Sequence, residues 1–128
     1  MASTDNEDDY VSNYTRAQAI ADGTLIDVTA TAREAGFKVP VALTRAAWDL
    51  CVALSPAAKK ACNDEAGRLW DILWMLRTAA ARASTSEVQF AVLCVTKRVR
   101  PGLVRLRSVI AGDDDGKPAI TVMLSDES

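Results

Sequence analysis

Apolar residues recur at three- and four-residue spacings over the first two-thirds of the chain and at two-residue spacings over the last third. The first spacing is typical of amphipathic helices, and the second of strands that bury one face. The clearest helical stripe predicts a long central helix over residues 64–83. It consists of Leu69, Ile72, Leu73 and Leu76. Trp70 and Trp74 flank this stripe, and their helical spacing favours packing in the core over exposure at an interface.

Shorter helices are predicted upstream from capping and stop signals. Thr15 and Gln18 have the spacing of a capping box, so a helix is expected to begin there. The predicted short helices span 16–22, a stretch from a cap at Thr29 or Thr31 to a glycine stop at Gly36, and 45–54. A serine–proline pair at 55–56 is typical of an N-cap followed by proline at the first helical position, which leaves room for a fifth helix. Residues 25–28 are expected to form only a brief extended piece.

Three strands are predicted in the last third, around 88–95, 104–110 and 120–124. The first is apolar on both faces in its second half, so both sides are expected to be covered. The second alternates Arg105 and Arg107 with apolar residues, as a half-buried strand does. The predicted fold class is therefore α+β: a helical N-terminal two-thirds with four or five helices, followed by a three-stranded antiparallel β-meander.

Length and charge indicate one domain with an acidic tail. The 128 residues fit a single domain, predicted over 13–125, and residues 1–12 are polar and acidic enough to form a disordered tail. The net charge is −2, but six of the 17 acids lie at the two ends. The remaining 11 acids are outnumbered by 15 basic residues, so residues 10–125 carry a net charge of about +4. No apolar run approaches the ~20 residues that span a bilayer, and the start is unlike a secretory signal. No membrane association is predicted, and the expected location is the cytoplasm.

The residue types present exclude most catalytic chemistry. The chain has no histidine, which removes serine–histidine and cysteine–histidine nucleophiles and nearly all catalytic zinc sites. Its three cysteines, Cys51, Cys62 and Cys94, are too few for a zinc site made of cysteine alone. Cys51 and Cys94 are expected to be small buried hydrophobes in a reducing compartment. We therefore predict no catalytic residue, metal site or cofactor, and no enzymatic activity; a carboxylate-based hydrolase is disfavoured.

Two charged clusters are the candidate binding residues. The basic surface consists of Lys97, Arg98, Arg100, Arg105 and Arg107. It suits contact with phosphate or carboxylate groups, and the alternative is a solvated outer sheet face with a charged loop. The acidic surface consists of Asp113, Asp114 and Asp115. Carboxylates there could act as acid–base groups or hold a cation, but the following glycine favours an exposed hairpin turn.

Three stretches resemble a known family. They are YTRAQAIADGTLIDVTATAREAGFKVPVALT at 14–44, GRLWDILWMLR at 67–77 and PAITVMLSDE at 118–127. They are similar to a family of short uncharacterised proteins, a domain of unknown function, encoded on bacterial plasmids, phages and integrative elements. The resemblance covers most of the chain and carries over no binding or catalytic residue. It implies that the gene for this protein lies among accessory genes of mobile genetic elements, some of which counter host restriction or CRISPR defence.

Two functions follow as hypotheses. The first is a non-enzymatic protein-binding accessory protein of a mobile genetic element, an inhibitor of host defence of the anti-CRISPR or anti-restriction type. Its partner would be a host protein or nucleoprotein complex. The second is a weak nucleic-acid-associated module that uses the basic surface and whose binding falls steeply with salt.

Overall fold

A computed structural model describes residues 14–53, 64–94 and 102–127 of the chain. The described elements are α2 (Arg16–Ala21), β1 (Leu25–Asp27), α3 (Thr29–Glu34), β2 (Val41–Thr44), α4 (Arg45–Cys51), α6 (Glu65–Ala80), β3 (Glu87–Cys94), β4 (Gly102–Gly112) and β5 (Pro118–Leu124). The acidic tail predicted for residues 1–12 and the fifth helix predicted after residue 55 lie outside these residues.

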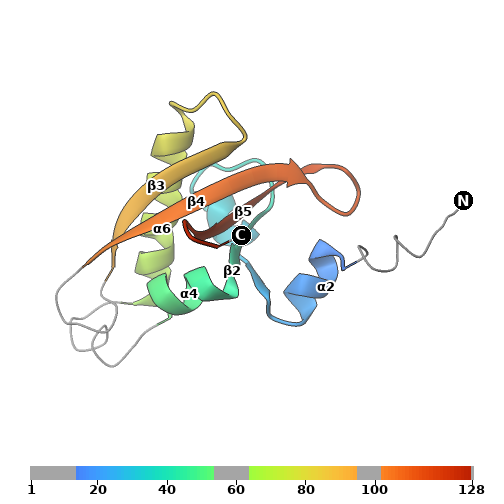
Figure 1. The fold of residues 1–128 in the computed structure, drawn as a ribbon, viewed down its shortest axis with the longest axis horizontal. Coiled ribbons are helices and arrows are strands. Elements are labelled where there is room, and N and C mark those ends of the chain that lie inside the picture. The colour runs from blue at the N-terminus through green and yellow to red at the C-terminus, as the bar shows by residue number, and fades with distance from the viewer. Residues whose placement is uncertain (1–13, 54–63, 95–101, 128) are drawn as a thin grey trace, which may run out of the picture.

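The strands form one five-stranded mixed sheet in the order β1-β2-β5-β4-β3. Neighbouring strands are antiparallel except for β2 and β5, which run parallel. In Figure 1, β3 and β4 cross in front of α6, which lies along one face of the sheet. The core lies between this face and the helices α3, α4 and α6. The short helix α2 lies by the opposite face, where Arg16 donates a hydrogen bond to Thr121 of β5.

The predicted architecture is wrong. Instead of a helical two-thirds followed by a three-stranded antiparallel meander, the N-terminal half contributes two strands to a mixed sheet. Of the four described helices, only α4 and α6 have seven residues or more. Strands β3, β4 and β5 do form where strands were expected, but β5 pairs on its other side with β2.

The missed strand β2 shows why local pattern was insufficient. Val41, Ala42 and Leu43 are all completely buried, so the strand has no polar alternation to mark it. It follows Pro40, which signals the end of a helix, and it leads directly into the N-cap Thr44 of α4. Pro40 instead opens the strand, because its carbonyl accepts a hydrogen bond from the Ile120 amide at 2.9 Å.

The helices α2 and α6 begin where the capping chemistry predicts. Thr15 and Gln18 form the predicted capping box at the start of α2, and Gly23 adopts a left-handed conformation (φ 85°) just after that helix. The central helix α6 begins at an N-cap, Asp64, whose carboxylate accepts a hydrogen bond from the Gly67 amide at 2.6 Å. The four residues of its predicted apolar stripe are all buried. The predicted cap of α3 at Thr29 or Thr31 is wrong, because Val28 is its N-cap and makes no side-chain cap hydrogen bond. Local signals therefore placed the starts of α2, α4 and α6 well, although they did not show the sheet.

If β2 is central to the core, shortening its largest side chain should be costly. We expect Leu43→Ala to lower the free energy of unfolding by about 2–5 kcal/mol, because Leu43 is completely buried and the substitution leaves a cavity. Leu103→Ala in β4 is the matched control, since Leu103 is largely exposed. It should change stability by less than about 0.5 kcal/mol. Urea unfolding measures both, and equal losses would contradict the assignment of β2 to the core.

Candidate functional site

Large apolar side chains gather at the surface where α6 meets β3 and β4. The members of this α6–β3 surface are Trp70, Trp74, Met75, Leu93 and Leu103. Leu93 is 70% exposed, Leu103 62% and Trp74 48%, which is unusual for side chains of this size. Trp74, Met75, Leu93 and Leu103 line one groove of about 350 Å³. Two predictions are therefore wrong: the tryptophans are not core residues, and the second half of β3 is not covered on both faces.

The helical period explains why the tryptophans reach the surface. Successive residues of a helix are about 100° apart, so Trp70 and Trp74 each point about 100° away from the buried leucine that precedes them in the sequence. Their rings stack on each other, with centroids 6.4 Å apart. The guanidinium of Arg77 lies 5.5 Å from the Trp74 ring and holds it by a cation–π contact. The aromatic part of the surface is thus ordered before any partner arrives.

Beside these side chains runs the open edge of β3. The Ile110 amide donates to the Ser86 carbonyl, which sets the phase of the β3–β4 ladder. In that phase Gln89, Ala91 and Leu93 direct their backbone N–H and C=O groups away from β4. Within the described part of the chain, β4 is the only strand next to β3. These groups therefore form a row of donors and acceptors along the groove.

One acidic side chain lies among the groove's apolar walls. Asp71 of α6 lines it together with Ala91 and Val92 of β3, in addition to the larger apolar residues. Because three consecutive β3 residues line the groove, it follows the strand's edge and not just one face. The site thus combines apolar walls, an exposed backbone edge and a single carboxylate.

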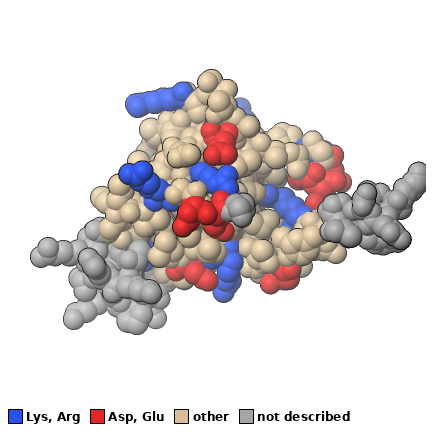
Figure 2. Space-filling view, in the orientation of Figure 1, with Lys and Arg blue, Asp and Glu red and all other residues tan. Residues whose placement is uncertain are grey.

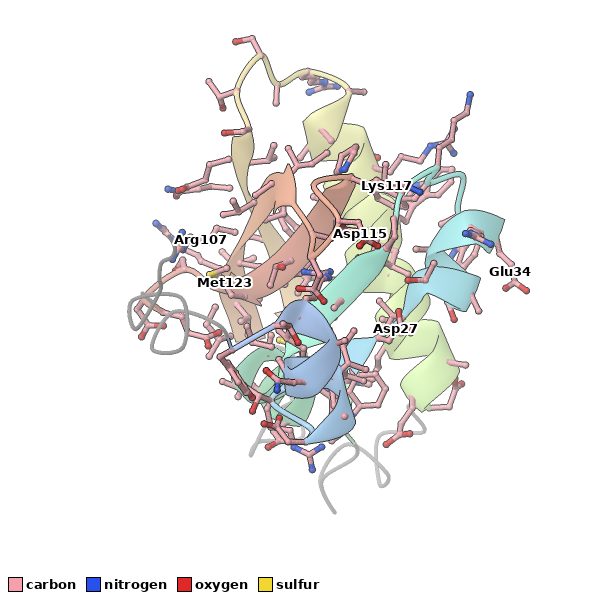
Figure 3. The ribbon with its side chains drawn as sticks, turned by 90° about the vertical axis from the view of Figure 1, so that its right-hand side faces the viewer. Asp27, Glu34, Arg107, Asp115, Lys117 and Met123 are labelled. Carbon is pink, nitrogen blue, oxygen red and sulfur yellow. The ribbon has the colours of Figure 1, made fainter. Side chains whose placement is uncertain are left out.

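The predicted basic surface is only partly assembled in the described residues. Lys97, Arg98 and Arg100 lie outside them. Arg105 and Arg107 do share one face of β4, and Arg105 is exposed. Arg107 lies beside Met123 of β5, as Figure 3 shows, and its side chain is only 17% exposed. In Figure 2 the basic side chains on the face in view lie apart from one another, among acidic ones.

Arg107 is already engaged within the protein. Its guanidinium contacts the Glu87 carboxylate at 3.3 Å and donates to the backbone carbonyl of Glu127. The Glu127 carboxylate in turn accepts hydrogen bonds from the Thr44 hydroxyl and the Leu124 amide, both at 2.7 Å. Arg107 therefore holds Glu127 against the sheet, and its guanidinium is largely occupied by these contacts.

The three aspartates of the acidic surface have separate structural tasks. Asp113 accepts hydrogen bonds from the amides of Asp115 and Lys117, both at 2.9 Å, and so closes the β4–β5 turn. Asp114 accepts from the amides of Arg16 and Ala17 at 2.8 and 3.0 Å, which fastens α2 to the turn. Asp115 is exposed beside Lys117 (Figure 3). The turn interpretation of this segment agrees with these contacts.

A small cleft of about 340 Å³ is lined by residues of this turn, α2 and β1. The Arg16 guanidinium beside it bonds the Thr121 hydroxyl at 2.6 Å and the Ile120 carbonyl at 2.7 Å. Burial lowers the pKa of Arg16, against the opposing effect of nearby aspartates such as Asp27 and Asp113. Arg16 is thus committed to anchoring α2, and we assign this cleft no chemistry.

The described residues contain no cluster of three or more histidine, cysteine or acidic side chains placed to hold a metal ion. Over the same residues, none of the helices combines the length and apolar character needed to cross a bilayer.

The attachment of α2 can be tested at Asp114. We expect Asp114→Ala to lower the free energy of unfolding by about 1 kcal/mol, because two amides at the helix start lose their acceptor. Hydrogen exchange at the Arg16 and Ala17 amides should accelerate. Asp115→Ala is the matched control, and it should leave both quantities within error. Equal exchange in the two variants would show that Asp114 does not fasten the helix.

Comparison with known proteins identifies a family for this chain, and the function of that family is unknown. No curated protein matches the chain, and no solved structure matches it. A family model does match, over residues 1–128, which is the entire chain. The protein therefore belongs to the family of unknown function DUF6573.

Proposed function

We propose that this protein is a non-enzymatic binding protein that recognises another protein through the α6–β3 surface. The observation that carries the proposal is the cluster of large exposed apolar side chains around a groove beside an open strand edge. Clusters of this kind mark interaction sites more often than isolated exposed residues do. Tryptophan in particular is enriched among the residues that dominate binding energy.

Burial of these side chains would supply the affinity. Removing apolar area from water contributes about 25 cal/mol per Å², so covering a few such side chains contributes several kcal/mol before the costs of association. The stacked Trp70 and Trp74 rings lose little conformational freedom on binding, because contacts within α6 already hold them. A partner can therefore use them as rigid anchors.

The open edge suggests how the partner binds. An extended segment laid along β3 would form main-chain hydrogen bonds with Gln89, Ala91 and Leu93. Its alternate side chains would enter the groove walled by Trp74 and Met75. Asp71 favours a lysine or arginine in that segment. The partner we propose is thus a protein with an exposed strand-like segment, apolar at alternate positions and carrying one basic residue.

The resemblance to proteins of mobile genetic elements suggests which partner to try first. We propose a host protein or nucleoprotein complex of restriction or CRISPR defence, which this protein would inhibit by occupying a surface. The alternative, weak nucleic-acid binding through the basic surface, is less supported because Arg107 is engaged with Glu87 and Glu127. A low-salt mobility shift lost on Arg105→Glu would favour that alternative.

Binding through the apolar surface can be tested by single substitutions. Tagged protein would be used to capture partners from bacteria with intact restriction and CRISPR systems. We expect Leu93→Ser and Trp74→Ala each to weaken binding of the captured protein at least tenfold, which corresponds to about 1.4 kcal/mol. Ile110→Ser is the matched control, since Ile110 is an exposed apolar strand residue outside the surface. Equal binding by all variants would contradict the proposal.

The strand-pairing mode makes a separate prediction at Ala91. Proline lacks a backbone donor, and the Ala91 amide points away from β4, so Ala91→Pro should leave the β3–β4 ladder bonded. We expect this variant to remain folded by circular dichroism and to lose partner binding, as measured by titration calorimetry. A folded Ala91→Pro variant that binds normally would exclude strand addition while leaving side-chain contact intact as a mode.

A further inference from the structure

Two cysteines far apart in the sequence lie in one buried cluster beneath the sheet. Cys51 is the last residue of α4 and Cys94 the last residue of β3. Both are reduced and buried, at 0% and 6% exposure. Their burial agrees with the sequence prediction, but their spacing of 43 positions did not indicate a pair. Cys62 lies outside the described residues.

A buried arginine accompanies the two thiols. Arg68 of α6 is only 7% exposed, and its Nε donates to the Cys51 carbonyl at 2.6 Å. One terminal nitrogen, Nη2, donates to the Leu50 carbonyl at 3.3 Å. The other, Nη1, is buried and has no hydrogen-bond partner among the described residues. A buried cation with an unused donor is costly unless a negative group forms nearby.

The contacts make the two thiols unequal. An interaction with Cys51 and the charge of Arg68 lower the pKa of Cys94, against the opposing effect of burial. The same interaction, together with burial, raises the pKa of Cys51. The two shifts have opposite directions, which favours Cys94 over Cys51 as the attacking thiol. Cys94 also retains the small exposed area that a diffusing reagent needs.

We propose that Cys51 and Cys94 form a redox-active dithiol, which a hydroperoxide oxidises to a disulfide linking α4 to β3. Two free thiols in one buried cluster, beside a buried guanidinium that has an unused donor, carry the proposal. It goes beyond the proposed binding function and does not depend on it, because the Cys94 side chain lies on the opposite face of β3 from Leu93.

The reaction would proceed in two steps. The Cys94 thiolate attacks one peroxide oxygen, the O–O bond breaks, and the departing oxygen leaves as water or an alcohol after taking a proton. Cys94 is then a sulfenic acid. The Cys51 sulfur attacks the Cys94 sulfur, the S–O bond breaks, and the released hydroxide takes the Cys51 proton to form water. With hydrogen peroxide, two thiols lose two electrons and yield one disulfide and two waters.

Mass spectrometry of the full chain tests this directly. Reduced protein would be treated with hydrogen peroxide, alkylated with iodoacetamide and digested. We expect a peptide linking Cys51 to Cys94, in the wild type and equally in the matched control Cys62→Ser. In Cys51→Ser the reaction should stop at a Cys94 sulfenic acid, which dimedone traps. Links made mainly to Cys62, or peroxide treatment that leaves both Cys51 and Cys94 alkylatable, would overturn the proposal.

Arg68 is a positioning residue in this proposal, and its role has its own readout. The rate of Cys94 alkylation against pH should shift to higher pH in Arg68→Gln and return towards the wild-type profile in Arg68→Lys. Circular dichroism would confirm that both variants fold. If Arg68→Gln fails to fold, the Arg68→Lys profile and the wild-type peptide map still decide the proposal. A folded Arg68→Gln with an unmoved profile would show that Arg68 only holds the end of α4.

Discussion

Three backbone pairings in the middle of the sheet join the two ends of the chain. They are Val41 with Ile120, Ala42 with Thr121 and Leu43 with Val122. This parallel contact between β2 and β5 brings β1 and α2 from the start of the chain to a hairpin from its end. Without it, β5 would be an edge strand. The core residues Val41 and Leu43 would then not be held in the same sheet as β5.

The central position of β2 and β5 determines which strands are left at the edges. Because β4 and β3 follow β5 outward, β3 becomes an edge strand, and α6 packs mainly against it. Proteins usually protect long edge strands from pairing with other chains. Here the groove beside the edge is walled by exposed Trp74 and Met75, which would favour an added strand rather than discourage one. The topology thus accounts for where the proposed interface lies.

Local signals predicted the local structure and little else. The capping box at Thr15, the cap at Asp64 and the stripe of α6 were each readable, since they depend on residues three or four apart. The β2–β5 pairing depends on residues about eighty apart. The first three residues of β2 are all buried, so no polar alternation marks it as a strand. The site was missed for a related reason. Leucine at 93 and 103 resembles core packing until the register shows that the two residues oppose each other on an uncovered face.

The charged residues singled out in the sequence were misleading for another physical reason. Arg107, Asp113 and Asp114 are conspicuous as charges, yet each satisfies backbone or side-chain groups within the protein. The sequence does not show whether a charged side chain is already bonded to another group inside the fold. Exposed apolar side chains differ, because no internal partner can satisfy them once they lie outside the core.

The last two residues of β3 belong to two different sites, one exposed and one buried. Leu93 and Cys94 are neighbours in sequence, but strand alternation sends their side chains to opposite faces. Leu93 belongs to the exposed surface, and Cys94 belongs to the same buried cluster as Cys51. A partner that paired with the Leu93 backbone would therefore be bonded to the same strand end that a disulfide would tie to α4. If partner affinity differs between the reduced and oxidised forms, linkage requires that partner binding change the reduction potential of the thiol pair by the same free energy.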